Sequence, residues 1–325
     1  MLATSKINLR LSITILIACA FELILRAQQA DQVFYNGKIL IVDSNFSVAE
    51  AVAVKSGRIS AVGSIAELSS RLGPSTERFD LKGRTVIPGL IDNHMHYMRG
   101  ASRWRFEARI DGVTSRAEAL KLIASKAKAA GPGNWVFVLG GWSEQQFADR
   151  PGGFTEKELD AAAPDNPVFI QKSYSRAYMN GLAAERLSTS SRSSSSGRSQ
   201  GRTRGSSGGR SFSTREIISR ATQFLPQRSS SERAKDVAFF NSVLNRYGLT
   251  AVYDVGRASD GDFTPVEELA KRNDLTVRVF HSLRYRANNS READEAVFLI
   301  NASKPHNNND WFGLIGMGEH IYNPA

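Results

Sequence analysis

The second half of the chain alternates short apolar runs with longer segments in which apolar residues recur at helical spacing. Strand and helix differ in this way because side chains alternate faces along a strand and repeat about every 3.6 residues along a helix. The pattern predicts helices at Ala117–Ala130, Ala234–Tyr247 and Pro265–Arg272, and strands at Trp135–Leu139, Pro167–Gln171, Leu249–Asp254, Thr276–His281 and Phe312–Glu319. Strands and helices that alternate along a chain are typical of a parallel α/β fold.

The region before these elements consists of short apolar strands separated by turn dipeptides. Asn-Gly between two apolar runs is the strongest short-range signal for a β-hairpin, and Ser-Gly and Lys-Gly favour turns for the same reason. The three dipeptides are Asn36-Gly37, Ser56-Gly57 and Lys82-Gly83. We therefore expect a small all-β domain over residues 31–87.

The first 27 residues have the pattern of an export leader. Lys6 and Arg10 precede the apolar run Leu11–Leu25, as in a secretory signal peptide. We expect an exported protein, periplasmic or secreted, with an uncleaved anchor or a lipid-modified Cys19 as the alternatives. No membrane span is expected beyond this leader. Cys19 is the only cysteine, so disulfides and thiol chemistry are excluded from the rest of the chain.

The most informative segment is Val86–His96, in which an apolar strand leads into two histidines. Residues two apart on a strand face the same side, so His94 and His96 can offer two imidazoles to one metal ion. Neutral imidazole is a common ligand of zinc. Asp92 shares that face, and its expected role is to orient the ligands. The alternatives are histidines satisfied by ordinary hydrogen bonds and a solvated turn aspartate.

This run resembles the signature of the amidohydrolase superfamily, Pro-Gly-apolar-apolar-Asp-x-His-x-His. Within the superfamily the chain is most similar to the branch called amidohydrolase family three. Further similarity is carried by Trp135–Trp142, Leu159–Ala161, Pro164–Val168 and Tyr178–Asn180. The resemblance covers residues 31–187 and 230–325.

The resemblance implies an α/β protein in which a small β-sandwich half-domain (residues 31–87) precedes a (β/α)8 TIM-type barrel. The barrel would occupy residues 88–325, with residues 135–233 as an inserted region. The last predicted strand is only the fourth of the eight that such a barrel needs. We therefore expect an incomplete barrel, about half of one, and a chain truncated before the family's remaining ligands.

The resemblance also implies two further site residues and a divalent metal cofactor, zinc being expected. Glu319, at the end of the fourth strand, would serve as a carboxylate ligand, with a solvated acid as the alternative. Arg176 lies where relatives carry a histidine near the substrate. Because arginine does not act as a base at neutral pH, this departure favours recognition of an anion or carboxylate.

The net charge of +10 is concentrated rather than spread along the chain. The tract Ser188–Ser211 contains five arginines and no acid, and it consists only of Ser, Arg, Gly, Thr and Gln. Such a composition cannot build a core and predicts disorder. A flexible insertion and a locally frame-shifted segment both explain it. Outside this tract and the leader the positive excess is mild, so no nucleic-acid partner is expected.

The expected function is hydrolysis of non-peptide carbon–nitrogen bonds, of the amide type, by metal-activated water acting on a small-molecule substrate. A non-catalytic remnant of the family is the first alternative. A secreted protein that binds polyanions through the Ser/Arg tract is the second. The sequence does not indicate the substrate or the oligomeric state.

Overall fold

The computed structural model describes residues 29–193, 213–256, 263–283, 287, 289–302, 306–307 and 309–318. The chain divides into two compact units with a boundary after Leu90. The expected leader with Cys19, residues 194–211 of the Ser/Arg tract, and Glu319 lie outside the described residues. Across the described ranges, no helix is long and apolar enough to cross a membrane.

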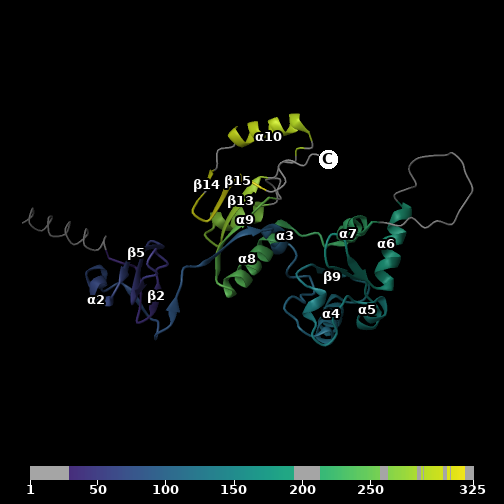
Figure 1. The fold of residues 1–325 in the computed structure, drawn as a ribbon, viewed down its shortest axis with the longest axis horizontal. Helices are drawn as coiled ribbons and strands as arrows, with labels where there is room; N and C mark the ends of the chain where they lie inside the picture. Colours follow the sequence, from purple (N-terminus) through teal and green to yellow (C-terminus); the bar gives the residue numbers. More distant parts are fainter. Residues whose placement is uncertain are drawn as a thin grey trace, which may run out of the picture. The chain divides into compact units, whose positions relative to one another are not determined.

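The first unit contains two small sheets (Figure 1). Their strands are β1 (Gln32–Tyr35), β2 (Lys38–Leu40), β3 (Val48–Ala49), β4 (Ala51–Lys55), β5 (Arg58–Gly63), β6 (Glu77–Asp80) and β7 (Thr85–Val86). One sheet has the order β5-β4-β1-β6 and the other β3-β2-β7. The short helix α2 (Ile65–Leu68), followed by the 3-10 turn η1 (Ser69–Arg71), covers the buried side chains of Val33, Ala51 and Ala53 with Leu68.

One predicted hairpin in this unit is wrong, because the chain turns a corner between the two sheets there. β1 pairs with β4 and β6, whereas β2 pairs with β3 and β7, so the strands flanking Asn36-Gly37 do not pair with each other. A second corner lies beside the first: the Gly83 N–H donates to the Asn36 carbonyl (2.7 Å). A Cβ on Gly37 would stand 2.5 Å from Leu81 Cδ1 and 3.0 Å from the Arg84 carbonyl oxygen, so a larger residue here would require the Leu81 side chain to shift. The Ser56-Gly57 hairpin between β4 and β5 is confirmed.

The second unit is built around a five-stranded sheet in the order β14-β15-β13-β12-β8. Its strands are β8 (Leu90–Met95), β12 (Leu249–Asp254), β13 (Arg278–Leu283), β14 (His306–Asn307) and β15 (Phe312–Met317). β12, β13 and β15 run parallel, as predicted, and the short strand β14 pairs antiparallel with β15 at one edge. The four predicted strands are therefore neighbours in chain order, which is the order a βα barrel requires. In the part of the chain described here they form an open sheet.

Helices connect these strands and supply the main core. They are α3 (Tyr97–Ala101), α8 (Ser230–Arg246), α9 (Thr264–Lys271) and α10 (Ser290–Ala302). α8 and α9 bury Val237, Phe240 and Leu269 against Val252 and Val279 of the sheet. This packing explains the helical spacing of the apolar residues in both segments.

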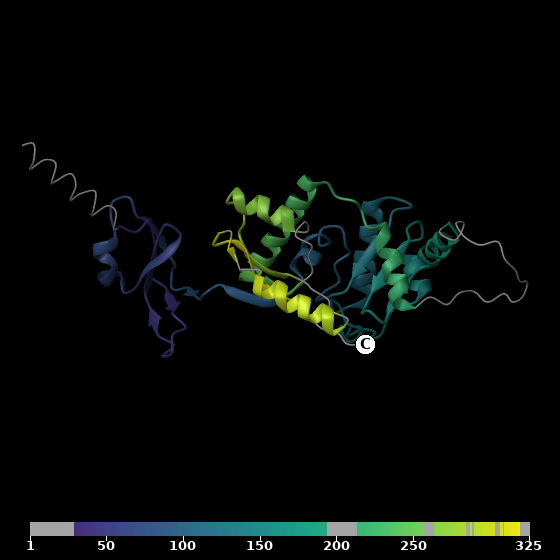
Figure 2. The ribbon, with the colours of Figure 1, turned by 90° about the horizontal axis from the view of Figure 1, so that it is seen from above.

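A separate region lies between β8 and α8 in the sequence and has its own sheet, in the order β11-β10-β9. Its strands are β9 (Val136–Leu139), β10 (Val168–Gln171) and β11 (Ala177–Met179), and its helices are α4 (Arg116–Ala130), α5 (Glu156–Ala162), α6 (Gly181–Ser193) and α7 (Thr214–Ala221). Both ribbon views show this β9–β11 region beside the central sheet without joining it (Figures 1 and 2). The predicted strands of the inserted region are confirmed in a sheet of their own.

Two boundaries of this region differ from the predicted ones. Its core already includes Ala108 and Ile110, so the region begins well before residue 135. α6 extends to Ser193, so the first six residues of the Ser/Arg tract are helical rather than disordered. The physical reason is that α6 starts at an ordered, buried turn, where the side chain of Asn180 accepts from the N–H of Ala183. Once a helix has nucleated there, each further residue adds one hydrogen bond without a new nucleation step, which helps the helix to extend into the serines.

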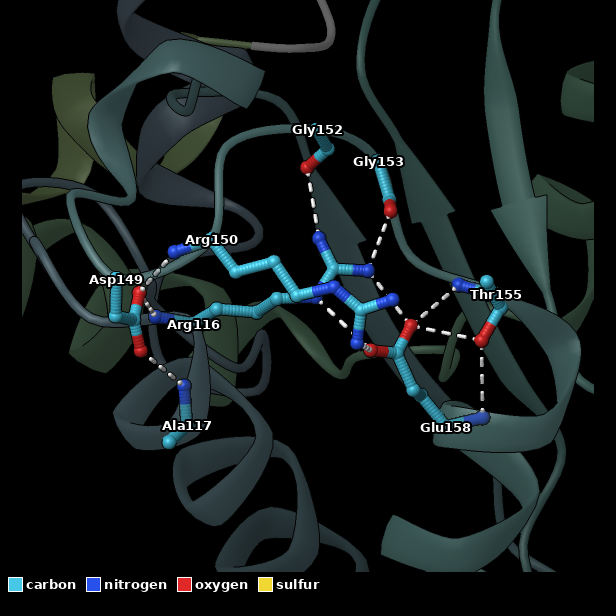
Figure 3. Close-up of polar contacts among 8 residues, drawn as sticks. All are labelled: Arg116, Ala117, Asp149, Arg150, Gly152, Gly153, Thr155 and Glu158. Carbon is cyan, nitrogen blue, oxygen red and sulfur yellow. Dashed lines mark hydrogen bonds and ion pairs between the residues drawn. The ribbon is translucent and has the colours of Figure 1, made fainter.

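Arg116 holds the β9–β11 region together from a buried position at the start of α4 (Figure 3). Its guanidinium makes a bidentate pair with Glu158 of α5, through Nε (3.0 Å) and Nη2 (2.6 Å). The same group donates to the carbonyls of Gly152 and Gly153. Only 5% of the Arg116 side chain is exposed, so the pair is shielded from water and screening.

We expect low pH to destabilise the β9–β11 region before the rest of the second unit. Hydrogen bonds from Arg116 hold the pKa of Glu158 at about 2, and backbone N–H groups at the start of α4 hold that of Asp149 at about 2. Because both folded-state values lie below the ordinary ones of 4.5 and 3.8, these carboxylates contribute stability above pH 4.5 that is lost as the pH falls towards 2.

The measurement is the midpoint of thermal unfolding against pH, followed by tryptophan fluorescence, to which Trp142 in this core contributes. We expect a steep fall between about pH 4.5 and about pH 2, and a shallower one in Glu158→Gln. A midpoint that stays flat across this window would contradict the assignment.

Candidate metal centre

The strand β8 carries the two histidines to its end. Asp92 and His94 lie on the strand, and His96 follows it directly, before α3 begins at Tyr97. The ring centroids of His94 and His96 are 6.4 Å apart, and the rings stand nearly edge to face at 75°. Both residues are exposed to solvent. The alternation predicted from the sequence thus brings two imidazoles close together at an accessible strand end.

Asp92 acts on the backbone of this segment. Its Oδ1 accepts a hydrogen bond from the N–H of His94 (3.0 Å). The carboxylate therefore fixes the local path of the strand between Asp92 and His94. This contact is compatible with the predicted orienting role.

The turn that presents His96 is anchored on both sides. The Val255 N–H donates to the Met95 carbonyl (3.3 Å), which ties the end of β8 to the end of β12. Tyr97 is fully buried, and its hydroxyl donates to Asn241 Oδ1 of α8 (2.6 Å). Burial raises the pKa of Tyr97 well above its usual value, so the hydroxyl remains a donor at every physiological pH. His96 is thus held between a strand neighbour and a helix.

Asp254, at the end of β12, is a site residue that sequence analysis missed. Only 2% of it is exposed, and its two carboxylate oxygens accept different backbone N–H groups, those of Met98 (3.1 Å) and Gly256 (3.2 Å). It therefore joins the first turn of α3 to the end of β12. The signal in the sequence was its position, because polar residues at the C-terminal ends of parallel strands line the sites of βα folds.

Replacement of Asp254 by Asn should destabilise the second unit by about 1–3 kcal/mol. An amide has one acceptor oxygen, so either Met98 or Gly256 would lose a hydrogen-bond acceptor in a buried place. Urea unfolding measures the change. Asp274→Asn is the matched control, since Asp274 is exposed and pairs with exposed Arg272, which limits its expected effect to about 0–1 kcal/mol. Equal effects of the two changes would contradict the assigned role.

A pocket of about 270 Å³ opens beside His96. Among the residues that the structure describes, it is lined by His96, Met98, Arg99, Ser102, Arg103, Arg233 and Asp254. The pocket is therefore formed by α3 with the loop after it, the first turn of α8 and the end of β12. One of the two histidines thus lines a cavity whose volume is just below the ~300–1,000 Å³ typical of small-molecule sites.

The donor set at the strand end fits a divalent metal only in part. Two accessible imidazoles are suitable ligands, and a catalytic zinc site uses three protein ligands and one open position. Over the described residues, no group of three or more His, Cys, Asp or Glu side chains is arranged to hold a metal ion. Glu319, predicted as a further ligand, lies outside those residues. His94 and His96 would thus supply part of such a site.

Arg176 lies in a different place from the histidine pair. It precedes β11 in the β9–β11 region, its side chain is 60% exposed, and it pairs with Glu144 (3.3 Å). Glu144 also accepts from Tyr178 and Lys172, and these contacts hold its pKa at about 2. Arg176 is absent from the lining of the pocket beside His96. Its predicted role in substrate binding stays a prediction.

Comparison with known proteins identifies the family of this chain. A family model described as "Amidohydrolase family" matches residues 77–320. The chain is 34% identical over 143 residues to Protein LONG AFTER FAR-RED 3 of Arabidopsis thaliana, covering 43% of this chain and 24% of that protein. It is 32% identical over 144 residues to N-substituted formamide deformylase of Arthrobacter pascens, covering 44% and 26%. The chain thus spans about a quarter of the length of these curated relatives.

A solved structure shows the same fold. A metal-dependent hydrolase from Pyrococcus furiosus superposes with a TM-score of 0.50 at 19% identity, covering 88% of this chain and 55% of that one. The family model spans well over half of the residues and includes β8 with its two histidines, β12 and β15. The chain belongs to the amidohydrolase family.

Proposed function

We propose that this chain is a metal-dependent hydrolase that acts on amide-type carbon–nitrogen bonds of small molecules. The observation that carries the proposal is the pair His94 and His96 at the end of β8, with a small pocket beside His96. Membership of the amidohydrolase family supports it. Zinc is the proposed metal, because it prefers imidazole ligands in hydrolytic sites.

In this proposal His94 and His96 hold the divalent ion. When bound, the ion supplies a water of lowered pKa and polarises the carbonyl of the substrate. Asp92 maintains the strand geometry through its bond to the His94 N–H. Asp254 and Tyr97 fix the turn that carries His96 beside the pocket. The pocket of about 270 Å³ limits the substrate to a small molecule.

We also propose that the protein is exported. The proposal is supported by the charged and apolar pattern of residues 1–27. Detection of the protein outside the cytoplasm of its host, and its retention inside after deletion of residues 1–27, is the test. Equal distribution of the two forms would overturn it.

Hydrolysis of an N-substituted formamide by the full 325-residue chain tests the main proposal. This probe is chosen because one relative is named as a deformylase of such compounds. We expect formate release that is abolished by a chelator, restored by zinc and lost in His94→Ala. His306→Ala is the control, since β14 lies at the opposite edge of the sheet from β8. The proposal would be contradicted if no formate were released, or if its release were unchanged by the chelator and by His94→Ala.

A further inference from the structure

A second pocket, of about 470 Å³, opens on the surface of the second unit. It is bounded by residues 104–109, by α4 and by Phe239 of α8. Among the residues that the structure describes, none lines both this pocket and the one beside His96. The volume falls within the ~300–1,000 Å³ typical of small-molecule sites.

The walls of this second pocket are mainly apolar and partly open to water. Leu122 and Phe239 both line it, and they are 37% and 44% exposed. Trp104 forms a further part of the wall, and the Arg109 guanidinium lies 3.9 Å from the centroid of the Trp104 ring, which holds the indole in place. A ligand with an apolar body would remove these surfaces from water and so gain free energy on binding.

Lys126 differs from the other cations of this pocket in its partner. Its Nζ donates to the backbone carbonyl of Arg105 (2.9 Å), and no carboxylate pairs with it in the part of the chain that the structure describes. Arg105, by contrast, pairs with Asp236 (3.0 Å), and Arg109 pairs with Glu107 (3.0 Å). Burial lowers the pKa of Lys126, although the charge of Glu107 acts in the opposite direction.

The ammonium of Lys126 retains capacity for a ligand. An ammonium carries three N–H donors, and the Arg105 carbonyl uses one of them. A carboxylate is the acceptor that complements the remaining donors best, because the hydrogen bond is charge-assisted on both sides. It would also compensate the ammonium for the water that burial has removed.

We propose that this pocket is a binding site, separate from the histidine pair, for a small carboxylic acid with an apolar body, such as an arylalkanoate. The carboxylate pairs with Lys126, and the apolar body packs against Trp104, Leu122 and Phe239. The site has no part in the proposed hydrolysis, so the inference stands or falls independently of that function.

Direct binding to the full chain tests the proposal. The probes are 3-phenylpropionate, the neutral 3-phenylpropionamide and acetate, measured by isothermal titration calorimetry at low salt. A chelator is present so that no carboxylate binds to a metal ion held by His94 and His96. We expect 3-phenylpropionate to bind at least about tenfold more tightly than either other probe, because the amide lacks the charge and acetate lacks the apolar body.

Variants of α4 locate the binding site. Lys126→Met should weaken binding of 3-phenylpropionate at least about tenfold, whereas Lys126→Arg should retain part of the affinity because the charge remains. Lys128→Met is the matched control, since Lys128 is exposed on the same helix and is not a lining residue. Ser125→Phe places a ring in the cavity from an exposed position and should weaken binding of 3-phenylpropionate and of its amide alike. Melting curves show whether each variant is folded, and Ser125→Phe gives the test if Lys126→Met is not.

The inference is overturned if the amide binds as tightly as 3-phenylpropionate, or if no probe binds at millimolar concentration. It is also overturned if Lys128→Met weakens binding as much as Lys126→Met. Binding that is lost in His96→Ala but kept in Ser125→Phe would place the probe in the other pocket. A dimer that Phe239→Ser dissociates, in a chain that binds no probe, would show that a second copy covers this surface instead.

Discussion

Replacement of Arg116 by Met is expected to destabilise the β9–β11 region by about 3–5 kcal/mol. The change leaves Glu158 without the bidentate partner that holds its charge in a site that is only 19% exposed. It also removes the donors to the carbonyls of Gly152 and Gly153. The contact between α4 and α5 is therefore weakened, because the Arg116–Glu158 ion pair joins these two helices.

The same glutamate provides a control for this experiment. Arg150 also reaches Glu158 (3.1 Å), but its side chain is 69% exposed (Figure 3). Arg150→Met should therefore cost about 1 kcal/mol or less. Urea unfolding followed by tryptophan fluorescence, to which Trp142 in this core contributes, compares the two variants. Equal losses would show that the buried pair has no special role, and a double variant Arg116→Met/Glu158→Met should recover part of the loss by removing the stranded charge.

The second large effect concerns zinc affinity. Replacement of His96 or His94 by Ala is expected to lower the affinity of the full chain for zinc by at least about 100-fold, because loss of a direct ligand exceeds the 10–100-fold cost of losing a group that only orients one. Competition with a chromophoric chelator measures the affinity. His306→Ala, on the edge strand β14 far from β8 in the sheet order, should leave it unchanged. Wild-type affinity in His94→Ala would contradict the assignment of the pair.

Local sequence patterns correctly predicted the elements that depend only on residues close to them in the chain. The apolar run before His94 predicted β8, and alternation alone placed both imidazoles at its end. The Ser56-Gly57 hairpin was predicted for the same reason. Asn36-Gly37 was misread because a turn dipeptide does not reveal whether the next strand returns to its own sheet. That outcome depends on Leu81 and the second corner at Gly83, which are distant in sequence.

Capping explains two other differences. α8 starts at Ser230 rather than at Ala234 because Ser229 and Glu232 form a capping box, a signature that was readable in the sequence. α6 continues into the Ser/Arg tract because its stability comes from the buried turn before it, which composition does not report. Composition predicts disorder of a segment in isolation, whereas the structure shows a helix already nucleated.

Sequence analysis predicted the two histidines of the candidate site but not the other residues that line the pocket. His94 and His96 stand two apart in one segment, whereas Asp254 and Arg233 reach the pocket from β12 and α8. Their contribution depends on the parallel sheet that brings the ends of β8 and β12 together. A polar residue at the end of each predicted strand was the available signal, and it identifies Asp254 but not the arginines.

The histidine side chains themselves give the most direct test of the metal centre. We would record proton–nitrogen correlation spectra of the imidazoles of the full chain during a zinc titration. The account predicts that the signals of His94 and His96 change together and saturate at the same zinc concentration, while the signal of buried His281, stacked on Phe263, stays in place. Zinc that leaves both signals unchanged, or that shifts them at different concentrations, would contradict a shared metal ion.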